Sequence, residues 1–452
     1  MKNLDKIFRA YDIRGIYPDE VNEDFAYKLG KALALFFKSK KILIGRDCRV
    51  SSDSLFDSLS RGFLDMGVNV VNMGACTTPM FYWVADKYNF DGGVMITASH
   101  NPAEYNGFKV IRGIIPIGMG SGLEKVKKLV LKANKGVSGE KGEMVSKDFL
   151  NEYINHILEF VHLKKIRPLR LVVDTANGVG GLVASRLFVS ASSREALDVG
   201  GAVPADVSFL FPELDGSFPG HDPNPSDSGS MDALCQEVVA KGADIGVAFD
   251  GDADRVVFVD EKGEVVSPDL IGALLVHHFF KDAGKILYTV VSSRNLVEEI
   301  MASGNEGVCS KVGHTFVKDK MMKEGISFGS EPSGHYYLKE NGFVESPFIV
   351  LLKVLDLISR NRIPLSVMVS VFDKYELVRR NYEVSNVKKV IKKLKKHFKG
   401  KVSLVDGLSI GFSDWWFNVR GSNTEPVLRL TLEARNRAVL EERLDEIEGL
   451  IK

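Results

Sequence analysis

The chain has 452 residues and carries 59 Lys and Arg against 59 Asp and Glu, so its formal net charge at neutral pH is zero. This balance excludes a global field that attracts nucleic acid or an anionic membrane, so a basic substrate site must be local. Hydrophobic residues make up 45% and charged residues 26%, which is typical of a globular chain of roughly two to four domains.

Neither the cysteines nor the apolar segments point to secretion or to a membrane. The cysteines are far apart, and none has the spacing of a zinc site or a disulfide framework: Cys48, Cys76, Cys235 and Cys309. Residues 1–6 lack the apolar segment of a signal peptide, and no apolar run approaches the roughly 18–20 residues of a membrane helix. We therefore expect a cytoplasmic protein without membrane or nucleic-acid partners.

The first part of the chain alternates between helix and strand patterns. Helices are expected at 22–39, 51–66 and 81–88, and strands at 41–45, 68–73 and 94–96. Their connections are too long for hairpins, which favours a mostly parallel α/β sheet. Ahead of these elements, Arg14 stands between Asp12 and a glycine, where it either forms a surface turn or aims a guanidinium at a phosphate.

Ser99 lies just past the strand at 94–96, before a polar Asn-Pro turn. The ends of strands are where open α/β sheets place their chemistry. His100 and Lys109 flank the serine, and a hydroxyl beside an imidazole and an ammonium group fits a nucleophile for an anionic group. The alternative is a polar turn around a buried serine.

A second α/β segment begins near residue 147 and contains a strand at 169–174. The glycine-rich loop at 175–181 matches no nucleotide-binding fingerprint, so it predicts a tight strand-to-helix turn. The stretch at 190–206 shows no clear helix or strand pattern.

A strand at 243–249 leads into three acidic residues at alternating positions, Asp250, Asp252 and Asp254. Carboxylates this close repel one another unless a hard cation compensates, and their oxygens are the ligands that Mg²⁺ accepts. A solvated acidic turn is the alternative. A strand pattern at 255–259 replaces the helix that would follow an EF-hand loop.

The later part of the chain predicts a third α/β domain and then a small α+β domain. A helix is expected at 269–282 and a strand at 285–291, and His314 precedes a further helix. The last segment has helices at 387–398 and 438–451 with strands between them, at 409–412, 415–419 and 427–432. The many lysines of the first of these helices predict a solvated face rather than a nucleic-acid patch, because no aromatic residues are interleaved with them.

A loop at 420–426 connects two of these strands. This loop predicts a site that binds an anion, which we call the anion cradle. The donors are its guanidinium, hydroxyl and amide groups and the backbone N–H groups that a glycine leaves free. The side chains of this cradle belong to Arg420, Ser422, Asn423 and Thr424.

Five separated motifs resemble, in type and order, those of the α-D-phosphohexomutases, which move a phosphoryl group between C1 and C6 of a hexose phosphate. The matching stretches are 11–15, 97–109, 250–255, 330–335 and 420–426, so the resemblance covers essentially the whole chain. It implies three mixed α/β sheet domains at 1–145, 146–249 and 250–363, and an α+β domain at 364–452, around a central cleft.

The resemblance also implies the roles of individual residues. Ser99 would carry the phosphoryl group and would bind one Mg²⁺ per chain together with Asp250, Asp252 and Asp254. The residues implied beside the substrate and the transferring phosphate are Arg14, Arg255 and His314. The sugar-specificity loop contributes Glu331, Ser333 and His335, and the loop that grips the unreactive phosphate contributes Arg420, Ser422, Asn423 and Thr424. A base for the attacking hydroxyl is needed, and its candidates are Lys109, His100 and His314.

The implied reaction interconverts hexose 1-phosphate and hexose 6-phosphate through a phosphoserine enzyme and a 1,6-bisphosphate, with a hexose 1,6-bisphosphate as primer, in a monomer or homodimer. Phe108 and Pro332 favour the branch that acts on mannose and glucose phosphates. The alternative, a phosphoglucosamine mutase, usually has Ile and Gln there. Two further hypotheses are a sugar-phosphate phosphatase that uses Ser99 and a non-catalytic sugar-phosphate binder. The binder predicts a missing serine or metal aspartate, and none is missing.

Overall fold

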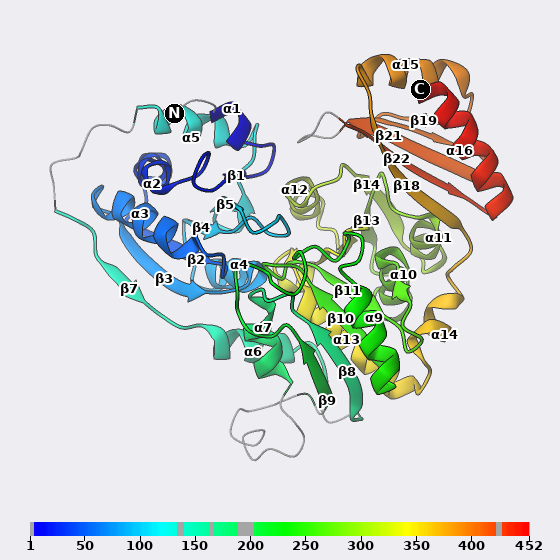
Figure 1. The fold of residues 1–452 in the computed structure, drawn as a ribbon, viewed down its shortest axis with the longest axis horizontal. Helices are drawn as coiled ribbons and strands as arrows, with labels where there is room; N and C mark the ends of the chain where they lie inside the picture. The colour runs from blue at the N-terminus through cyan, green and yellow to red at the C-terminus, as the bar shows by residue number, and fades with distance from the viewer. Residues whose placement is uncertain are drawn as a thin grey trace. The chain divides into compact units, whose positions relative to one another are not determined.

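A mixed sheet organises the N-terminal part of the chain in the computed structural model, which describes residues 4–132, 140–162, 167–188, 203, 205–421 and 427–451. Its strands follow the order β1-β5-β4-β2-β3-β7 (Figure 1). Strand β6 pairs with β5. The strands are β1 (Ile13–Ile16), β2 (Lys41–Arg46), β3 (Asn69–Ala75), β4 (Gly92–Ile96), β5 (Tyr105–Arg112), β6 (Ile115–Pro116) and β7 (Met144–Ser146). The helices are α1 (Leu4–Ile7), α2 (Glu23–Phe37), α3 (Ser52–Leu64), α4 (Thr78–Lys87) and α5 (Leu123–Val130).

The predicted parallel arrangement is confirmed for β4, β2, β3 and β7, whereas β5 runs antiparallel to both β4 and β1. The sequence analysis did not predict a strand at 105–112. Six consecutive residues of β5, from Asn106 to Ile111, are buried, so this strand lacks the alternation of polar and apolar residues by which a half-buried strand is recognised. The Ser99 turn is therefore a reversal between two antiparallel strands.

A second mixed sheet has the order β12-β11-β10-β8-β9. Its strands are β8 (Leu169–Asp174), β9 (Ala205–Leu210), β10 (Ile245–Phe249), β11 (Val256–Val259) and β12 (Val265–Val266), accompanied by α6 (Leu150–Leu158), α7 (Gly180–Leu187) and α9 (Asp232–Lys241). β8 pairs in parallel with β9 and β10, whereas β10 and β11 are antiparallel and enclose the acidic loop at 250–255. The predicted tight turn between β8 and α7 is confirmed, with Ala176 and Asn177 in the left-handed region. Most of the stretch at 190–206 lies outside the described residues.

The chain divides into two compact units, Met1–Val266 with Ser333–Ser366, and Ser267–Pro332 with Val367–Lys452. The first unit contains both sheets described above and also the hairpin of β16 (Tyr336–Leu338) and β17 (Val344–Glu345), followed by α13 (Pro347–Asn361). The ring of Phe348 in α13 stacks on Phe249 of β10, with centroids 4.7 Å apart. This stacking anchors the returning segment beside the strand that leads into the acidic loop.

The second unit begins with a parallel sheet in the order β14-β13-β15. Its elements are α10 (Pro268–Phe279), β13 (Lys285–Thr289), α11 (Arg294–Ala302), β14 (Glu306–Ser310), α12 (His314–Glu324) and β15 (Phe328–Ser330). The predicted helix at 269–282 and strand at 285–291 correspond to α10 and β13, which confirms the α/β character of this segment.

The C-terminal part of the second unit is an antiparallel sheet in the order β18-β22-β21-β20-β19. Its strands are β18 (Glu376–Glu383), β19 (Lys401–Ser403), β20 (Leu408–Gly411), β21 (Trp415–Gly421) and β22 (Val427–Ala434), with helices α15 (Val387–His397) and α16 (Arg437–Ile451) (Figure 1). The backbone N–H of Arg294, at the start of α11, donates to the carboxylate of Glu433 on β22 at 2.9 Å. This bond joins the antiparallel sheet to the α/β part of the same unit.

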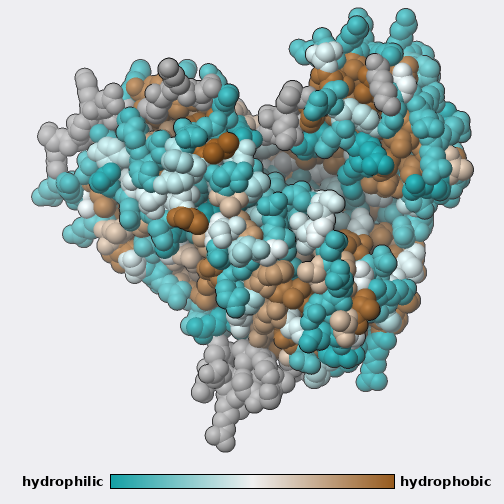
Figure 2. Space-filling model, viewed as in Figure 1, coloured by the Kyte–Doolittle hydropathy of each residue, from teal (hydrophilic) through white to brown (hydrophobic). Residues whose placement is uncertain are grey.

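The surface agrees with the predictions for helix α15. Its lysines at positions 388, 389, 392, 393, 395 and 396 are exposed, while Leu394 is fully buried. On the face drawn in Figure 2, hydrophilic residues predominate and apolar residues occur mostly in separate groups. Among the helices that the structure describes, none combines the length and apolarity needed to cross a lipid bilayer.

Candidate active site

The turn between β4 and β5 presents Ser99 in an unusual backbone conformation. Ser99 has φ of 53°, in the left-handed region that a residue with a side chain enters only at a cost. Its N–H donates to Oγ1 of Thr97 at 2.8 Å, and only 3% of the residue is exposed. Because β1 pairs with β5, Arg14 lies in register with Gly107 beside this turn. Strand pairing thus brings the two N-terminal motifs together.

The Ser99 hydroxyl lies between a carboxylate and an imidazole. Its Oγ is 3.1 Å from Oδ2 of Asp250 and 3.2 Å from Nδ1 of His100. The guanidinium of Arg255 donates to the same imidazole nitrogen at 2.7 Å, so Nδ1 is an acceptor. Burial and the positive charges of Arg255 and Arg14 hold the pKa of His100 well below its ordinary value. His100 is therefore neutral at physiological pH.

Lys109 reaches the acidic loop from β5. Its Nζ donates to Oδ2 of Asp252 at 2.7 Å and to Oδ2 of Asp254 at 2.6 Å, and 4% of its side chain is exposed. Burial alone would lower the pKa of Lys109, but these two carboxylates raise it well above its ordinary value. Lys109 therefore stays cationic.

The acidic loop holds three buried carboxylates. Ligand atoms of Asp250, Asp252 and Asp254 all lie within 4.8 Å of one another. Burial, together with the charges of Asp254 and Asp252, holds the pKa of Asp250 well above its ordinary value. Oδ1 of Asp252 is buried and has no hydrogen-bond partner among the described residues. An orphaned carboxylate oxygen in such a cluster fits a hard divalent cation, so these residues could hold Mg²⁺.

The segment at 333–335 approaches the same loop. Nε2 of His335 lies 3.1 Å from Oδ1 of Asp254, and its Nδ1 lies 2.8 Å from Oγ of Ser333. The carbonyl of Gly334, a residue with φ of 90°, accepts from the N–H of Val256 at 3.0 Å. The sequence analysis connected His335 and Ser333 only with sugar binding, and it missed their link to the acidic loop.

The remaining predicted residues belong to the second unit. His314 is the first residue of α12, and the N–H of Gly313 before it donates to Oε1 of Glu331 at 3.1 Å. Arg420 lies near the end of β21. Ser422, Asn423 and Thr424 lie outside the described residues. A cleft shared by Arg420 and Ser99 stays a prediction.

Two buried polar residues at this site escaped the sequence analysis. Thr78 donates through Oγ1 to Oδ2 of Asp252 at 2.6 Å, and Arg49 contacts the carbonyls of the Ser99 turn. They follow β3 and β2, which run parallel to one another, as β2 does to β4. The carboxyl ends of parallel strands share one edge of a sheet. Polar residues after each predicted strand were therefore a usable sequence signal.

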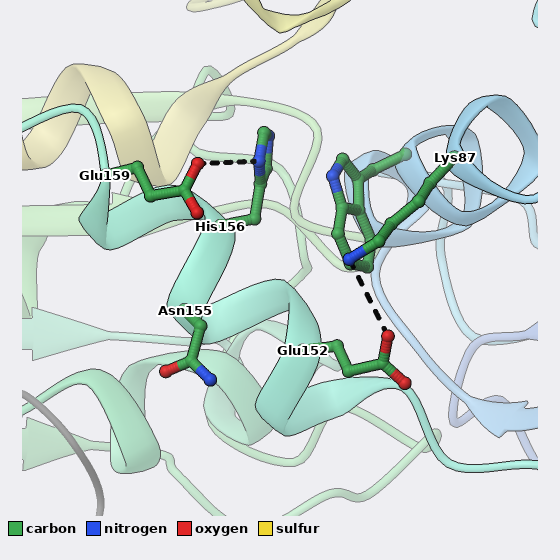
Figure 3. Close-up of a pocket in the computed structure, with 6 residues that line it drawn as sticks. Lys87, Glu152, Asn155, His156 and Glu159 are labelled. Atoms are coloured by element: carbon green, nitrogen blue, oxygen red, sulfur yellow. Dashed lines mark ion pairs between the residues drawn. The ribbon is translucent and has the colours of Figure 1, made fainter.

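A concavity of about 430 Å³ lies between α4 and α6 and contains none of the predicted residues (Figure 3). Trp83 lines this concavity, and the ring of His156 stacks on it with centroids 5.1 Å apart. Nζ of Lys87 lies 4.5 Å from the centroid of the Trp83 indole. The carboxylates of Glu152 and Glu159 pair with Lys87 and His156, respectively. Its side chains pair with one another, so the concavity offers no evident chemistry.

A partly buried ion pair joins the loop at 221–223 to the end of β8. Nε2 of His221 lies 3.1 Å from Oδ2 of Asp174, which is fully buried at the end of β8. Burial opposes the charged imidazole, but the hydrogen bond and charge of Asp174 raise the pKa of His221 above its ordinary value. Two residues further on, the carbonyl of Pro223 accepts from the N–H of Gly251 at 3.2 Å. The pair therefore supports the acidic loop from behind.

We expect His221→Gln to destabilise the protein more at pH 6 than at pH 9. A raised folded-state pKa gives stability that is fully present below the unfolded pKa and lost as pH rises through the folded value. The deficit in Tm relative to wild type should be about 2 °C larger at pH 6, as measured by circular dichroism. His162→Gln, at an exposed position, is the control. A His221→Gln deficit equal at both pH values would contradict the ion pair.

Comparison with known proteins extends over the whole chain. The family described as phosphoglucomutase/phosphomannomutase matches in four parts: alpha/beta/alpha domains I, II and III at residues 5–118, 151–263 and 267–375, and the C-terminal domain at 380–450. A phosphomannomutase of Vibrio cholerae is 34% identical, with 100% of this chain and 99% of the relative covered. A phosphoglucomutase of Neisseria meningitidis is 34% identical, with 99% and 96% covered.

A solved structure agrees with these relatives. A phosphoglucomutase/phosphomannomutase family protein from Burkholderia thailandensis has a TM-score of 0.87 at 29% identity, with 99% of this chain and 97% of that chain covered. Four family-domain matches that together span the chain define the class of phosphohexomutases. The chain belongs to the phosphoglucomutase/phosphomannomutase family. The predicted family and fold class are confirmed.

Proposed function

We propose that this chain is a phosphohexomutase that interconverts the 1-phosphates and 6-phosphates of mannose and glucose through phosphorylated Ser99. The observation that carries the proposal is the Ser99 hydroxyl, 3.1 Å from Asp250 in a cluster of three buried carboxylates. Such a cluster would repel a phosphoryl group unless a cation intervened, so serine and metal ligands are useful only together. Membership of the family over the whole chain supports the same reaction.

Asp250, Asp252 and Asp254 would hold one Mg²⁺ per chain, which supplies positive charge against the phosphoryl oxygens of Ser99. Lys109, kept charged by its two carboxylate partners, would add a fixed cation behind the same group. Arg14 and Arg255 would present guanidinium groups to the equatorial oxygens of the transferring phosphoryl group. These roles follow from charge and from contacts with the surroundings of Ser99: Arg14 bonds to Asn101, Arg255 to His100, and Lys109 to the acidic loop.

The attacking hydroxyl needs a base that accepts its proton. The pKa shifts of Lys109 and His100 bear differently on this role. Lys109 suits this role poorly, because its raised pKa keeps it protonated. His100 is neutral beside Ser99 because its pKa is lowered, but its Nδ1 already accepts a hydrogen bond from Arg255. His314 is the third candidate.

The substrate would be held at its two ends, in a cleft lined by four domains at 1–145, 146–249, 250–363 and 364–452. Hydroxyl groups of the sugar would bind the loop side chains Glu331, Ser333 and His335. The phosphate that does not react would bind Arg420, Ser422, Asn423 and Thr424. A hexose 1,6-bisphosphate would load the phosphoryl group onto Ser99 before the first turnover. The bisphosphate must reorient in the site so that its other phosphate faces Ser99. The phosphate-binding loop at 420–426 therefore has to accept the phosphate at either end of the sugar.

A coupled assay with mannose 1-phosphate, glucose 1-phosphate and glucosamine 1-phosphate, in the presence of Mg²⁺ and a bisphosphate primer, tests the proposal. We expect turnover of the first two to their 6-phosphates, with glucosamine 1-phosphate a poorer substrate. Release of inorganic phosphate without isomerisation would instead identify a phosphatase. Binding of all three without any product would identify a sugar-phosphate binder.

A further inference from the structure

We infer that Arg49 is a positioning residue of the phosphoryl transfer, whose buried guanidinium holds the backbone of the turn that presents Ser99. The inference rests on the proposed function. Arg49 belongs to the segment after β2, and its side chain is 0% exposed. A guanidinium so completely removed from solvent cannot bind an incoming anion directly. Its donors are used inside the protein instead.

The contacts of Arg49 converge on a single turn. Its Nη1 donates to the carbonyls of Pro102 at 2.6 Å and Tyr105 at 3.0 Å. Its Nη2 donates to the carbonyl of Ser99 at 2.9 Å and to that of Asn101. The two outer nitrogens therefore bind four carbonyls between residues 99 and 105. These are the residues that reverse the chain between β4 and β5.

This turn needs such a partner because its carbonyls lie in a reversal with little regular structure. Unpaired buried carbonyl groups are costly, and a non-glycine residue with positive φ returns to an extended or helical conformation unless its neighbours prevent it. Ser99 has this conformation, with φ of 53°. Its carbonyl is fixed by Arg49 on one side, while its N–H is fixed by Thr97. The peptide flanking the nucleophile is thereby held against rotation.

Arg49 is itself tightly fixed. Its Nε lies 3.2 Å from Oδ2 of the buried Asp47, whose Oδ1 accepts from the Arg49 N–H at 3.0 Å. The ring of Phe218 covers the guanidinium at 4.9 Å. A Cβ at Gly216 would lie 2.3 Å from the Arg49 backbone, so the 215–218 loop packs directly against it. The pair with Asp47 compensates the buried charge.

The chemical consequence concerns the Ser99 hydroxyl. Oγ must point at once toward Asp250 and toward His100, at 3.1 and 3.2 Å. Arg49 touches neither the hydroxyl nor the residues proposed to bind substrate, so its loss should lower kcat and leave KM nearly unchanged. Lysine cannot replace it, because one ammonium group cannot reach four carbonyls arranged around a planar fork.

The test compares Arg49→Ala and Arg49→Lys with Arg46→Ala, a nearby arginine that pairs with Asp53 at the surface. Turnover of glucose 1-phosphate and hydrogen exchange of the peptide at 97–106 are measured for each variant, with and without millimolar guanidinium. We expect kcat of Arg49→Ala to fall about 100-fold, the typical effect of an ångström-scale misplacement, with KM within about twofold. Free guanidinium should enter the vacated space, restore at least about tenfold of kcat, and slow exchange of this peptide again.

Arg49→Lys should lose kcat to a similar extent without rescue, because its side chain occupies the space, and Arg46→Ala should match wild type. Loss of kcat below about threefold in Arg49→Ala, or no rescue while the variant unfolds cooperatively, would overturn the inference. If Arg49→Ala does not fold, Arg49→Lys tests the positioning role instead. Unchanged hydrogen exchange at 97–106 in Arg49→Lys, or global unfolding of that variant too, would show that Arg49 only stabilises the fold. If wild type had no mutase activity but Arg49→Ala still sped up hydrogen exchange at 97–106, the proposed function would be refuted. The structural role of Arg49 in holding this turn would remain.

Discussion

Replacing Ser99 by alanine is expected to lower mutase turnover by about 10⁴-fold or more, because the variant has no atom that can carry the phosphoryl group between substrate molecules. Binding of a hexose 1-phosphate should persist, since no other binding residue is changed. The coupled assay measures the loss, and incubation with radiolabelled hexose 1,6-bisphosphate measures the label on the protein. Wild type should take up one label per chain and Ser99→Ala none.

The matched control is Ser403→Ala, an exposed serine on β19. It should retain wild-type turnover and labelling. If Ser99→Ala kept even a tenth of the wild-type rate while folded, phosphorylated Ser99 could not be the intermediate. If the label reached Ser99 and was released only as inorganic phosphate, the phosphatase hypothesis would replace the mutase.

Much of this site could be predicted because its chemistry is concentrated in short loops that follow recognisable strands. The buried runs before Ser99 and before Asp250 fix where each loop begins. Three carboxylates at alternating positions have few stable explanations besides a cation. The link between the two loops came from the family resemblance, and the 3.1 Å from Ser99 to Asp250 agrees with it.

The rest depends on contacts that no local pattern encodes. Arg49 and Asp47 show no functional pattern in the sequence, and only the carbonyl arrangement of a turn distant in sequence makes their burial favourable. His335 reads as part of a sugar loop, and its approach to Asp254 depends on the pairing of Val256 with Gly334. Tertiary partners of this kind decide whether a polar residue is solvated or structural.

We expect Asp250 to lower the stability of the metal-free protein, and its replacement is the second change with a large expected effect. The pKa of Asp250 is raised by burial and by Asp254 and Asp252, so ionising Asp250 in the folded state is unfavourable. A raised carboxyl pKa means that stability falls as pH rises above the unfolded value. We expect this cost to be offset when a cation binds to the three carboxylates.

The variant Asp250→Asn should separate the effect of Asp250 on metal binding from its effect on the stability of the metal-free protein. We expect mutase turnover to fall about 10³-fold or more, because the variant loses a charged metal ligand next to Ser99. In the presence of a chelator at pH 7, the same variant should unfold about 2 °C higher than wild type, because burial makes the ionised form of Asp250 unfavourable and asparagine carries no charge. The amide oxygen of the new side chain can still accept from the N–H groups of Asp254 and Arg255, as Asp250 does at 3.0 and 3.2 Å.

Titration with Mg²⁺ should then reverse the order of the Tm values, so that wild type becomes more stable than Asp250→Asn. A ligand that binds only the folded state stabilises it by about 2.7 kcal/mol at a hundredfold excess over Kd, so the Tm of wild type should rise while that of Asp250→Asn stays nearly constant. Asp24→Asn, which removes an exposed carboxylate paired with Lys28, should follow wild type throughout. A wild-type Tm indifferent to Mg²⁺, or an Asp250→Asn variant less stable than wild type in chelator, would show that this cluster is balanced by its own lysine and arginine partners and has no need of a cation.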